Sequence, residues 1–193
     1  MIIDKYKRVR DYKKLKEMLL KEERWSFGAY ESGLNKKKCI DLYIFLHLCN
    51  SDKKWVALDE QNNLLGIITI KYLKKKKMKR KLGDIAIKIF SLFLTKEQRD
   101  GINNYYYGTR EAYEGKPSNE SEITLLMTDC ERRNQGVGKR LLEEAEKFLK
   151  EKQVNNIGVN TDSCCDYKFY EKNGFKLLFK NNFNEDELYF YRK

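Results

Sequence analysis

Residues 133–140 read Arg-Asn-Gln-Gly-Val-Gly-Lys-Arg, and this stretch decides how the rest of the chain is interpreted. An apolar run at residues 123–127 precedes it, and apolar residues at helical spacing follow it at 141–149. The pattern predicts a strand that leads through a glycine turn into a helix. The first turn of a helix carries unpaired N–H groups and partial positive charge, which favour an anion. Because Gly136 and Gly138 leave the backbone accessible, residues 133–140 are predicted to form a diphosphate cradle.

The glycine spacing excludes two common phosphate-binding loops. A Walker loop has four residues between its glycines, followed by Lys and Ser or Thr. A dinucleotide-binding turn has three glycines at GxGxxG spacing. Residues 133–138 instead resemble the Arg/Gln-x-x-Gly-x-Gly/Ala motif of the GNAT superfamily of N-acetyltransferases, which holds the pyrophosphate of acetyl-coenzyme A.

A second motif lies at residues 167–175, which read Tyr-Lys-Phe-Tyr-Glu-Lys-Asn-Gly-Phe. Asp162 or Ser163 is predicted to cap a short helix here, and Gly174 to end it in the left-handed conformation before a strand at 175–179. The stretch resembles the Leu/Phe-Tyr-Glu-Lys-x-Gly-Phe ending of the GNAT core, at the separation from the cradle that this family uses. Two motifs in the family's order therefore support the same resemblance.

The N-terminal part of the chain agrees with this resemblance. Its pattern predicts a strand at 2–9, a helix capped by Asp11, a loop at 23–35, a helix at 36–49, and a hairpin of strands at 55–58 and 64–70. The resemblance implies a single domain, residues 1–193, with a mixed α/β fold. We expect a twisted, mostly antiparallel sheet with helices on both faces.

An insertion of residues 74–118, between the third and fourth strands, departs from a minimal GNAT core. It begins in a lysine run, which we interpret as a solvated segment. Apolar residues then recur at helical spacing, at Ile85, Ile89, Phe90, Phe93 and Leu94. They predict helices that pack on the body of the domain. Our hypothesis is that the insertion forms part of the wall of the acceptor site.

The composition restricts the classes of protein to which this chain can belong. The chain has 193 residues, of which 41% are apolar and 36% charged, as expected for one globular domain. It has no apolar run of membrane-spanning length and no apparent signal peptide. Its five cysteines are odd in number and form no CxxC pair, so we expect neither a disulfide framework nor a metal site, and a cytoplasmic location. Despite a net charge of +11, nucleic acid and membrane are not expected as partners. A homodimer remains open.

The resemblance implies direct transfer of acetyl from acetyl-coenzyme A to a primary amine of a small molecule or peptide, without a metal or an acyl-enzyme. Backbone amides of the strand before the cradle would hold the thioester and polarise its carbonyl. Tyr170, in the second motif, is the candidate general acid for the departing thiolate, or alternatively a group that orients the sulfur. Glu122 resembles in its offset a catalytic glutamate of histone acetyltransferases and is the candidate general base, with Glu120 as the alternative.

The cofactor-binding residues that the resemblance implies are Leu126, Met127, Thr128, Arg133, Asn134, Gln135, Gly136, Val137, Gly138, Lys139, Asn160, Ser163, Tyr167 and Tyr170. Ser163 stands where many relatives have an asparagine that contacts the pantetheine, so a two-sided amide contact would be lost. His47, the only histidine, is interpreted as a packed side chain. Cys164 and Cys165 are likewise interpreted as core residues rather than nucleophiles.

Two other functions remain as alternatives. One is a non-catalytic coenzyme A-binding sensor or partner module on the same fold. The other is a nucleic-acid-binding protein that uses the lysine run. For an acetyltransferase, aminoglycosides, polyamines, amino acids and protein N-termini all remain open as acceptors.

Overall fold

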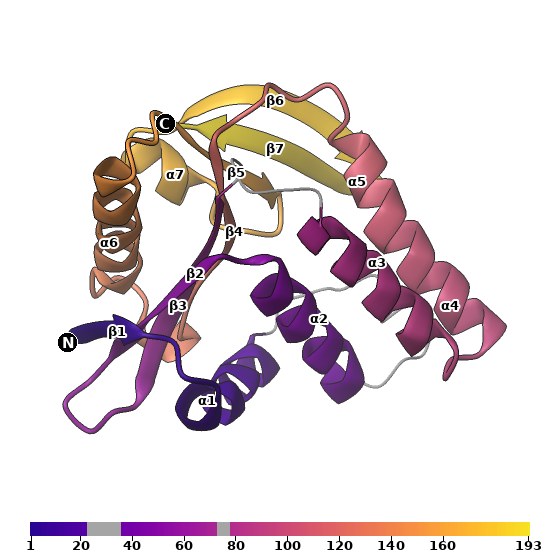
Figure 1. Ribbon diagram of the computed structural model, residues 1–193, viewed down its shortest axis with the longest axis horizontal. Helices are drawn as coiled ribbons and strands as arrows, with labels where there is room; N and C mark the ends of the chain where they lie inside the picture. Colours follow the sequence, from indigo (N-terminus) through magenta and orange to yellow (C-terminus); the bar gives the residue numbers. More distant parts are fainter. Residues whose placement is uncertain (23–35, 73–77) are drawn as a thin grey trace.

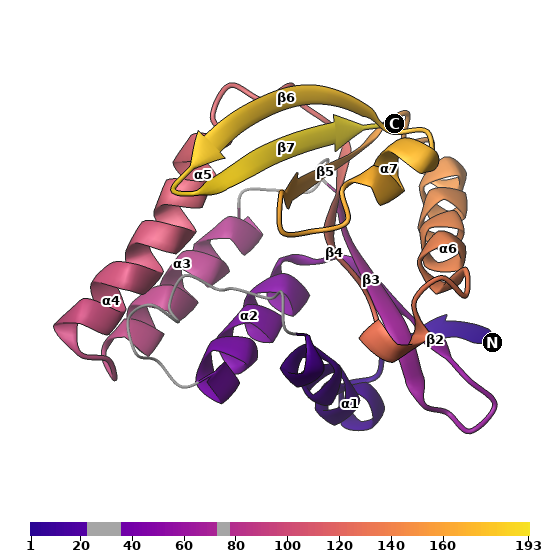
Figure 2. The ribbon, with the colours of Figure 1, turned by 180° about the vertical axis from the view of Figure 1, so that it is seen from behind.

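A twisted seven-stranded sheet organises the molecule (Figures 1 and 2). The computed structural model describes residues 1–22, 36–72 and 78–193. The predicted loop at 23–35 and most of the lysine run lie outside these ranges.

The strands are β1 (Ile2–Lys5), β2 (Lys53–Leu58), β3 (Leu64–Tyr72), β4 (Ser121–Thr128), β5 (Ile157–Asp162), β6 (Lys176–Phe183) and β7 (Asp186–Arg192). The helices are α1 (Arg8–Lys21), α2 (Lys36–Asn50), α3 (Met78–Ser91), α4 (Lys96–Asn103), α5 (Thr109–Ala112), α6 (Val137–Glu151) and α7 (Lys168–Lys172). A π-helical turn, Asn104–Gly108, joins α4 to α5, so the three form one continuous rod in Figure 1.

The strand order is β1-β2-β3-β4-β5-β7-β6. Neighbouring strands are antiparallel except β4 and β5, which are parallel. The predicted fold class, a mostly antiparallel mixed sheet with helices on both faces, is therefore confirmed. The predicted strand at 175–179 is β6, which is longer, and β7 was not predicted. These two strands form a hairpin that returns the chain to the free edge of β5.

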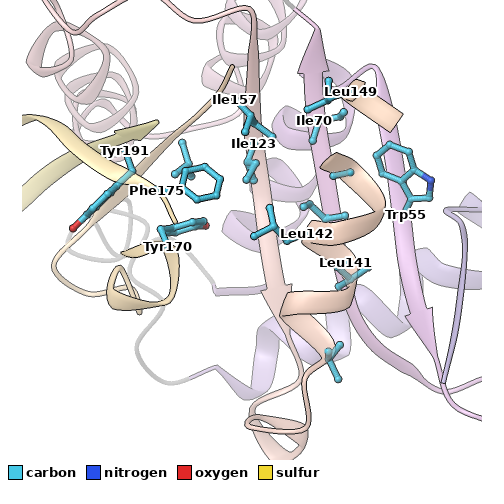
Figure 3. Close-up of a cluster of buried hydrophobic side chains, with 14 of the residues drawn as sticks. Trp55, Ile70, Ile123, Leu141, Leu142, Leu149, Ile157, Tyr170, Phe175 and Tyr191 are labelled. Atoms are coloured by element: carbon cyan, nitrogen blue, oxygen red, sulfur yellow. The ribbon is translucent and has the colours of Figure 1, made fainter. Parts of the chain in front are cut away.

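Successive side chains of a strand point to opposite faces of the sheet, and each face has its own hydrophobic core. Trp55 packs under α6 with Leu141, while the next residue, Val56, packs under α1 and α2 with Leu15 and Ile44. Figure 1 shows α6 and α7 on one face of the sheet and α1 and α2 on the other, and Figure 3 shows the α6 core in detail. Burial of both faces explains the nearly continuous apolar run of β3.

The insertion folds into helices, as predicted, but with a different buried face. Ile87 and Ile102 are 1% and 0% exposed and pack with apolar residues of α2 in a third core. Of the five predicted residues, Phe90 and Leu94 are partly buried against this core, so the prediction is confirmed for them. It is wrong for Ile85, Ile89 and Phe93, which are 50%, 55% and 80% exposed. The sequence has apolar residues on both sides of α3, and spacing alone could not identify the buried side.

Two helix starts also differ from the prediction. Helix α1 begins at Arg8, and Asp11 lies buried in its first turns instead of capping it. The Asp11 carboxylate accepts hydrogen bonds from the Lys7 amide at 2.7 Å and from Arg10 Nε at 2.6 Å. It therefore reaches back to the residue before the helix, much as the last residue of a capping box does.

At α7 the predicted cap is wrong as well. The residue before the helix is Tyr167, which makes no side-chain cap. The Asp162 carboxylate instead accepts the amides of Cys164 and Cys165, at 3.1 and 3.0 Å, in the preceding turn. Gly174 does have the predicted left-handed conformation, with φ of +84°.

Candidate active site

Strands β4 and β5 separate part-way along their length. Their pairing ends at Ile123 and Val159, whereas β4 continues to Thr128 and β5 to Asp162. We call this point the β4–β5 fork; Figure 1 shows the two strands diverging beyond it. Past the fork, none of the strands in the described ranges pairs with the edge of β4 that faces β5. Backbone groups there are free to pair with an extended ligand.

The predicted cradle lies at the far end of β4. Gly66 in β3 allows α6 to begin close to the sheet, because a Cβ at this position would lie 2.8 Å from the Met127 carbonyl oxygen and 3.1 Å from both Val137 and Leu141. Gly136 precedes α6 with φ of +76°, and a Cβ built there meets nothing within 4 Å. The first N–H groups of α6 have no acceptor within the helix. The cradle therefore combines free donors with open space, which suits a phosphate.

Two cationic side chains of the cradle region are already paired. The Arg133 guanidinium, 43% exposed, contacts the Glu22 carboxylate at the end of α1. Lys21 lies 2.9 Å from Glu131 across the same junction. The Lys21–Glu131 pair is at the surface and contributes little to stability, whereas the Glu22 side chain of the other pair is only 12% exposed. An anion bound at the cradle can compete with Glu22 for Arg133.

Gly138 has a packing role that was not predicted. A Cβ at this position would lie 3.3 Å from the Phe169 ring and 3.6 Å from the Thr128 methyl group. The missing side chain therefore makes room for α7 against α6. The close approach of a phosphate to Gly136 and Gly138 stays a prediction.

Tyr170 lies inside this arrangement, on α7. It is 8% exposed, and its ring is surrounded by those of Phe169, Phe175 and Tyr191. Figure 3 shows its hydroxyl pointing toward β4. Within the described ranges the hydroxyl makes no hydrogen bond. Burial, and then the nearby acidic groups, raise the pKa of Tyr170 well above its ordinary value, so the phenol remains protonated at neutral pH.

Glu122 lies at the β4–β5 fork, on the opposite face from Ile123 and its α6 core. Its carboxylate is 3.3 Å from the Lys116 ammonium and accepts a hydrogen bond of 3.4 Å from the Asn160 amide. The Asn160 side chain is thus turned toward Glu122. Glu120, the alternative base, accepts the Asn155 amide at 2.7 Å in the loop before β5.

The other predicted residues have varied positions. Tyr167 packs on Tyr189 with ring centroids 4.7 Å apart, and Leu126 packs against the α6 core. Ser163 is exposed, and its hydroxyl accepts the Glu187 amide at 3.2 Å. The structure therefore brings together the end of β4, the cradle and Tyr170, whereas Ser163 lies at the edge beside β7.

Cys164 and Cys165 are exposed in the turn before α7, so their assignment to the core is wrong. A hydrogen bond to Asp186 raises the pKa of Cys164 to about 11, which keeps that thiol protonated. All five cysteines carry free thiols. The His47 ring packs against that of Tyr43 at an interplanar angle of 53°, and burial lowers the pKa of His47 to about 4, as expected for a packed side chain.

Comparison with known proteins relates the C-terminal part of the chain to a known family. Residues 112–192 match the family model described as an acetyltransferase (GNAT) domain, and the match contains both motifs, β4, β5 and Tyr170. The C-terminal part of this chain is therefore similar to a GNAT acetyltransferase domain. No curated protein matches the sequence significantly.

Solved structures share the fold of this chain over its whole length. A GNAT acetyltransferase from Staphylococcus aureus Mu50 is 19% identical, with a TM-score of 0.55, and the match covers 100% of this chain and 97% of the other. An aminoglycoside 6'-N-acetyltransferase complexed with coenzyme A is 15% identical, with a TM-score of 0.59 and coverage of 100% and 96%. An agmatine N-acetyltransferase is 10% identical, with a TM-score of 0.63 and coverage of 100% and 98%. At these identities the likeness establishes the fold alone.

Among the helices of the described part of the chain, none has both the length and the apolar character needed to cross a bilayer. Across residues 1–22, 36–72 and 78–193, no three His, Cys, Asp or Glu side chains gather as a metal site would require.

Several residues that shape the candidate site were not identified from the sequence. Gly66 offered a signal, since a glycine inside an apolar strand indicates close approach of another element. Lys116 and Glu22 offered none, because their partners, Glu122 and Arg133, are charged surface-type residues with many candidate counterions. Their pairing depends on the tertiary fold.

Proposed function

We propose that this protein transfers the acetyl group of acetyl-coenzyme A directly to a primary amine of a small molecule or peptide. The observation that carries the proposal is the alignment of three features along β4: the fork, the cradle at its far end, and the Tyr170 hydroxyl between them. The diphosphate would bind at Gly136 and the first turn of α6, and the pantetheine arm would pair with the free edge of β4.

Four steps of the proposed reaction each need a chemical group of the protein. The free β4 amides near Leu126 to Thr128 would hold the thioester and stabilise the charge that develops on its carbonyl oxygen. Glu122, on the face away from α6, would take a proton from the acceptor ammonium. Tyr170, kept protonated by burial, would give a proton to the departing thiolate.

The acceptor site would lie on the Glu122 face of the fork, beside the end of the insertion. Proteins of this fold are named for aminoglycoside and agmatine acetylation, which makes amine acceptors the class to test. The five free thiols suit a reducing compartment, and we propose the cytoplasm.

A screen of primary amines for thiol release from acetyl-coenzyme A tests the proposal. The panel contains an aminoglycoside, agmatine, a polyamine, free amino acids and a short peptide with a free N-terminus. We expect release above the amine-free background with at least one class. Acetyl-coenzyme A binding without release would favour the non-catalytic module, and salt-sensitive binding of arbitrary DNA without cofactor binding would favour the nucleic-acid alternative.

A further inference from the structure

Lys116 brings an amine to the β4–β5 fork from the end of the insertion. Its Nζ atom donates to Asn160 Oδ1 at 2.7 Å and to Glu122 Oε2 at 3.3 Å. Glu122 lies in the last paired stretch of β4, and Asn160 is the first residue of β5 beyond the pairing. The ammonium therefore bridges the two strands at the point where they separate.

The surroundings of Lys116 have the chemistry of an ammonium-binding site. The Nζ atom lies 4.9 Å from the centre of the Phe190 ring and 5.3 Å from that of Tyr113. A carboxylate, an amide oxygen and two aromatic faces are the groups that bind an alkylammonium ion. The Lys116 side chain is 20% exposed, so most of it is enclosed.

The segment that carries Lys116 is fixed to the sheet on both sides. The Tyr113 hydroxyl donates to the Thr161 carbonyl oxygen at 2.7 Å, and Arg192 donates to the Ser118 carbonyl oxygen at 3.1 Å. These bonds hold the backbone around Lys116 against β5 and β7. The fold therefore holds the Lys116 amine next to Glu122. For an amine held in this way, no separate acceptor would have to bind.

We propose that Lys116 is an internal acceptor and that the protein acetylates its own Lys116. The inference rests on the proposed function, because it requires the thioester to lie in the fork. The Lys116 ammonium gives one proton to Glu122, and its nitrogen then attacks the thioester carbonyl carbon. An N–C bond forms and the C–S bond breaks. Tyr170 gives a proton to the departing thiolate. The nitrogen loses a second proton, which replaces the one that Tyr170 gave. The products are an acetylated lysine, a free thiol and one proton released through Glu122.

This modification would change the acceptor site. Acetylation removes the positive charge that lies 3.3 Å from the Glu122 carboxylate. The carboxylate would then face an incoming amine without an internal counterion. Self-acetylation of Lys116 thus gives the site a second state with one more net negative charge.

The test is incubation of the full-length protein with acetyl-coenzyme A alone, followed by peptide mass mapping over time. Lys13, whose side chain is 87% exposed, reports the uncatalysed background. Because Lys116 is more enclosed, uncatalysed acetylation would favour Lys13. We expect Lys116 to be acetylated at least about tenfold faster than Lys13, as proximity predicts.

Two variants complete the design. Lys116→Arg keeps the charge and should abolish the fast acetylation. Gly136→Asn, which narrows the cradle, should slow acetylation of Lys116 and leave Lys13 unchanged. Acetylation of Lys116 no faster than that of Lys13, or equally fast in Gly136→Asn, would overturn the inference. Thiol release with an amine from the panel would show in either case that the proposed function stands, and absent acetyl-coenzyme A binding in calorimetry would show that it fails.

Discussion

Gly138, in the first turn of α6, lies against the ring of Phe169 in α7, where a Cβ would be only 3.3 Å from Cε2 of that ring. The two motifs that are separated along the chain by α6 and β5 therefore touch. Phe169 precedes Tyr170, so this contact fixes the position of the candidate acid relative to the cradle. The glycine of one motif and the aromatic pair of the other are best understood as one packed unit.

Gly136→Asn should weaken acetyl-coenzyme A binding by about tenfold or more, since one lost phosphate contact is worth roughly 1.5–3 kcal/mol. Gly115→Asn is the matched control, because both glycines have positive φ, +76° and +86°, and a Cβ at either meets nothing within 4 Å. Asparagine tolerates this conformation, so both variants should fold. Calorimetry that gave equal affinities for the two would remove Gly136 from the cofactor site.

In the insertion, Ile87→Ala should cost about 2–4 kcal/mol of unfolding free energy, because it leaves a cavity in a buried cluster. Ile89→Ala, on the exposed side of the same helix, should change it by less than about 0.5 kcal/mol. Urea denaturation measures both. Similar losses at the two positions would mean that the exposed side of α3 is covered in solution.

The sequence predicted most of what local chemistry determines. Gly174 and the glycine turn before α6 were predicted because a left-handed residue and a helix start have local signals. The hairpin of β2 and β3 was predicted from its polar turn, where Asp59 accepts the amides of Gln61 and Asn63.

What the sequence could not supply are relations between distant residues. The strand β7 closes the sheet beside β5, but its partner cannot be identified from its own residues. The buried side of α3 depends on where α2 lies, so Ile87 and Ile89 could not be told apart. The pairing of Lys116 with Glu122 likewise exists only once the insertion returns to β4.

Glu122→Gln should lower kcat/KM most near neutral pH and least at high pH, where the amine acceptor is already neutral. The range for a positioned base is roughly 10²–10⁴. Glu120→Gln tests the alternative base; because its carboxylate accepts the Asn155 amide in the loop before β5, we expect a smaller effect on the profile than from Glu122→Gln. A loss that is the same at every pH would indicate substrate positioning, and no loss would exclude Glu122 from the mechanism.

Stability should fall between about pH 6.5 and pH 4 because of His47. Burial lowers the pKa of His47 from 6.5 to about 4, so in this window the unfolded chain takes up a proton that the folded chain does not. The free energy of unfolding should therefore decrease as the pH falls through the window, by on the order of 1–2 kcal/mol. Denaturation curves of His47→Gln should lack this component. An unchanged pH dependence in that variant would mean that His47 titrates normally.

The most direct test of the account is the effect of Tyr170→Phe on thiol release from acetyl-coenzyme A with an accepted amine. The substitution removes only the hydroxyl that points toward β4, and Tyr191→Phe is the matched control, since its hydroxyl bonds Glu171 at 2.8 Å. We predict that kcat falls by roughly 10²–10⁴ in Tyr170→Phe alone, with cofactor affinity unchanged. The wild-type kcat should also show no loss from Tyr170 ionisation up to about pH 10, because burial raises its pKa. A Tyr170→Phe variant that keeps its kcat would contradict the account.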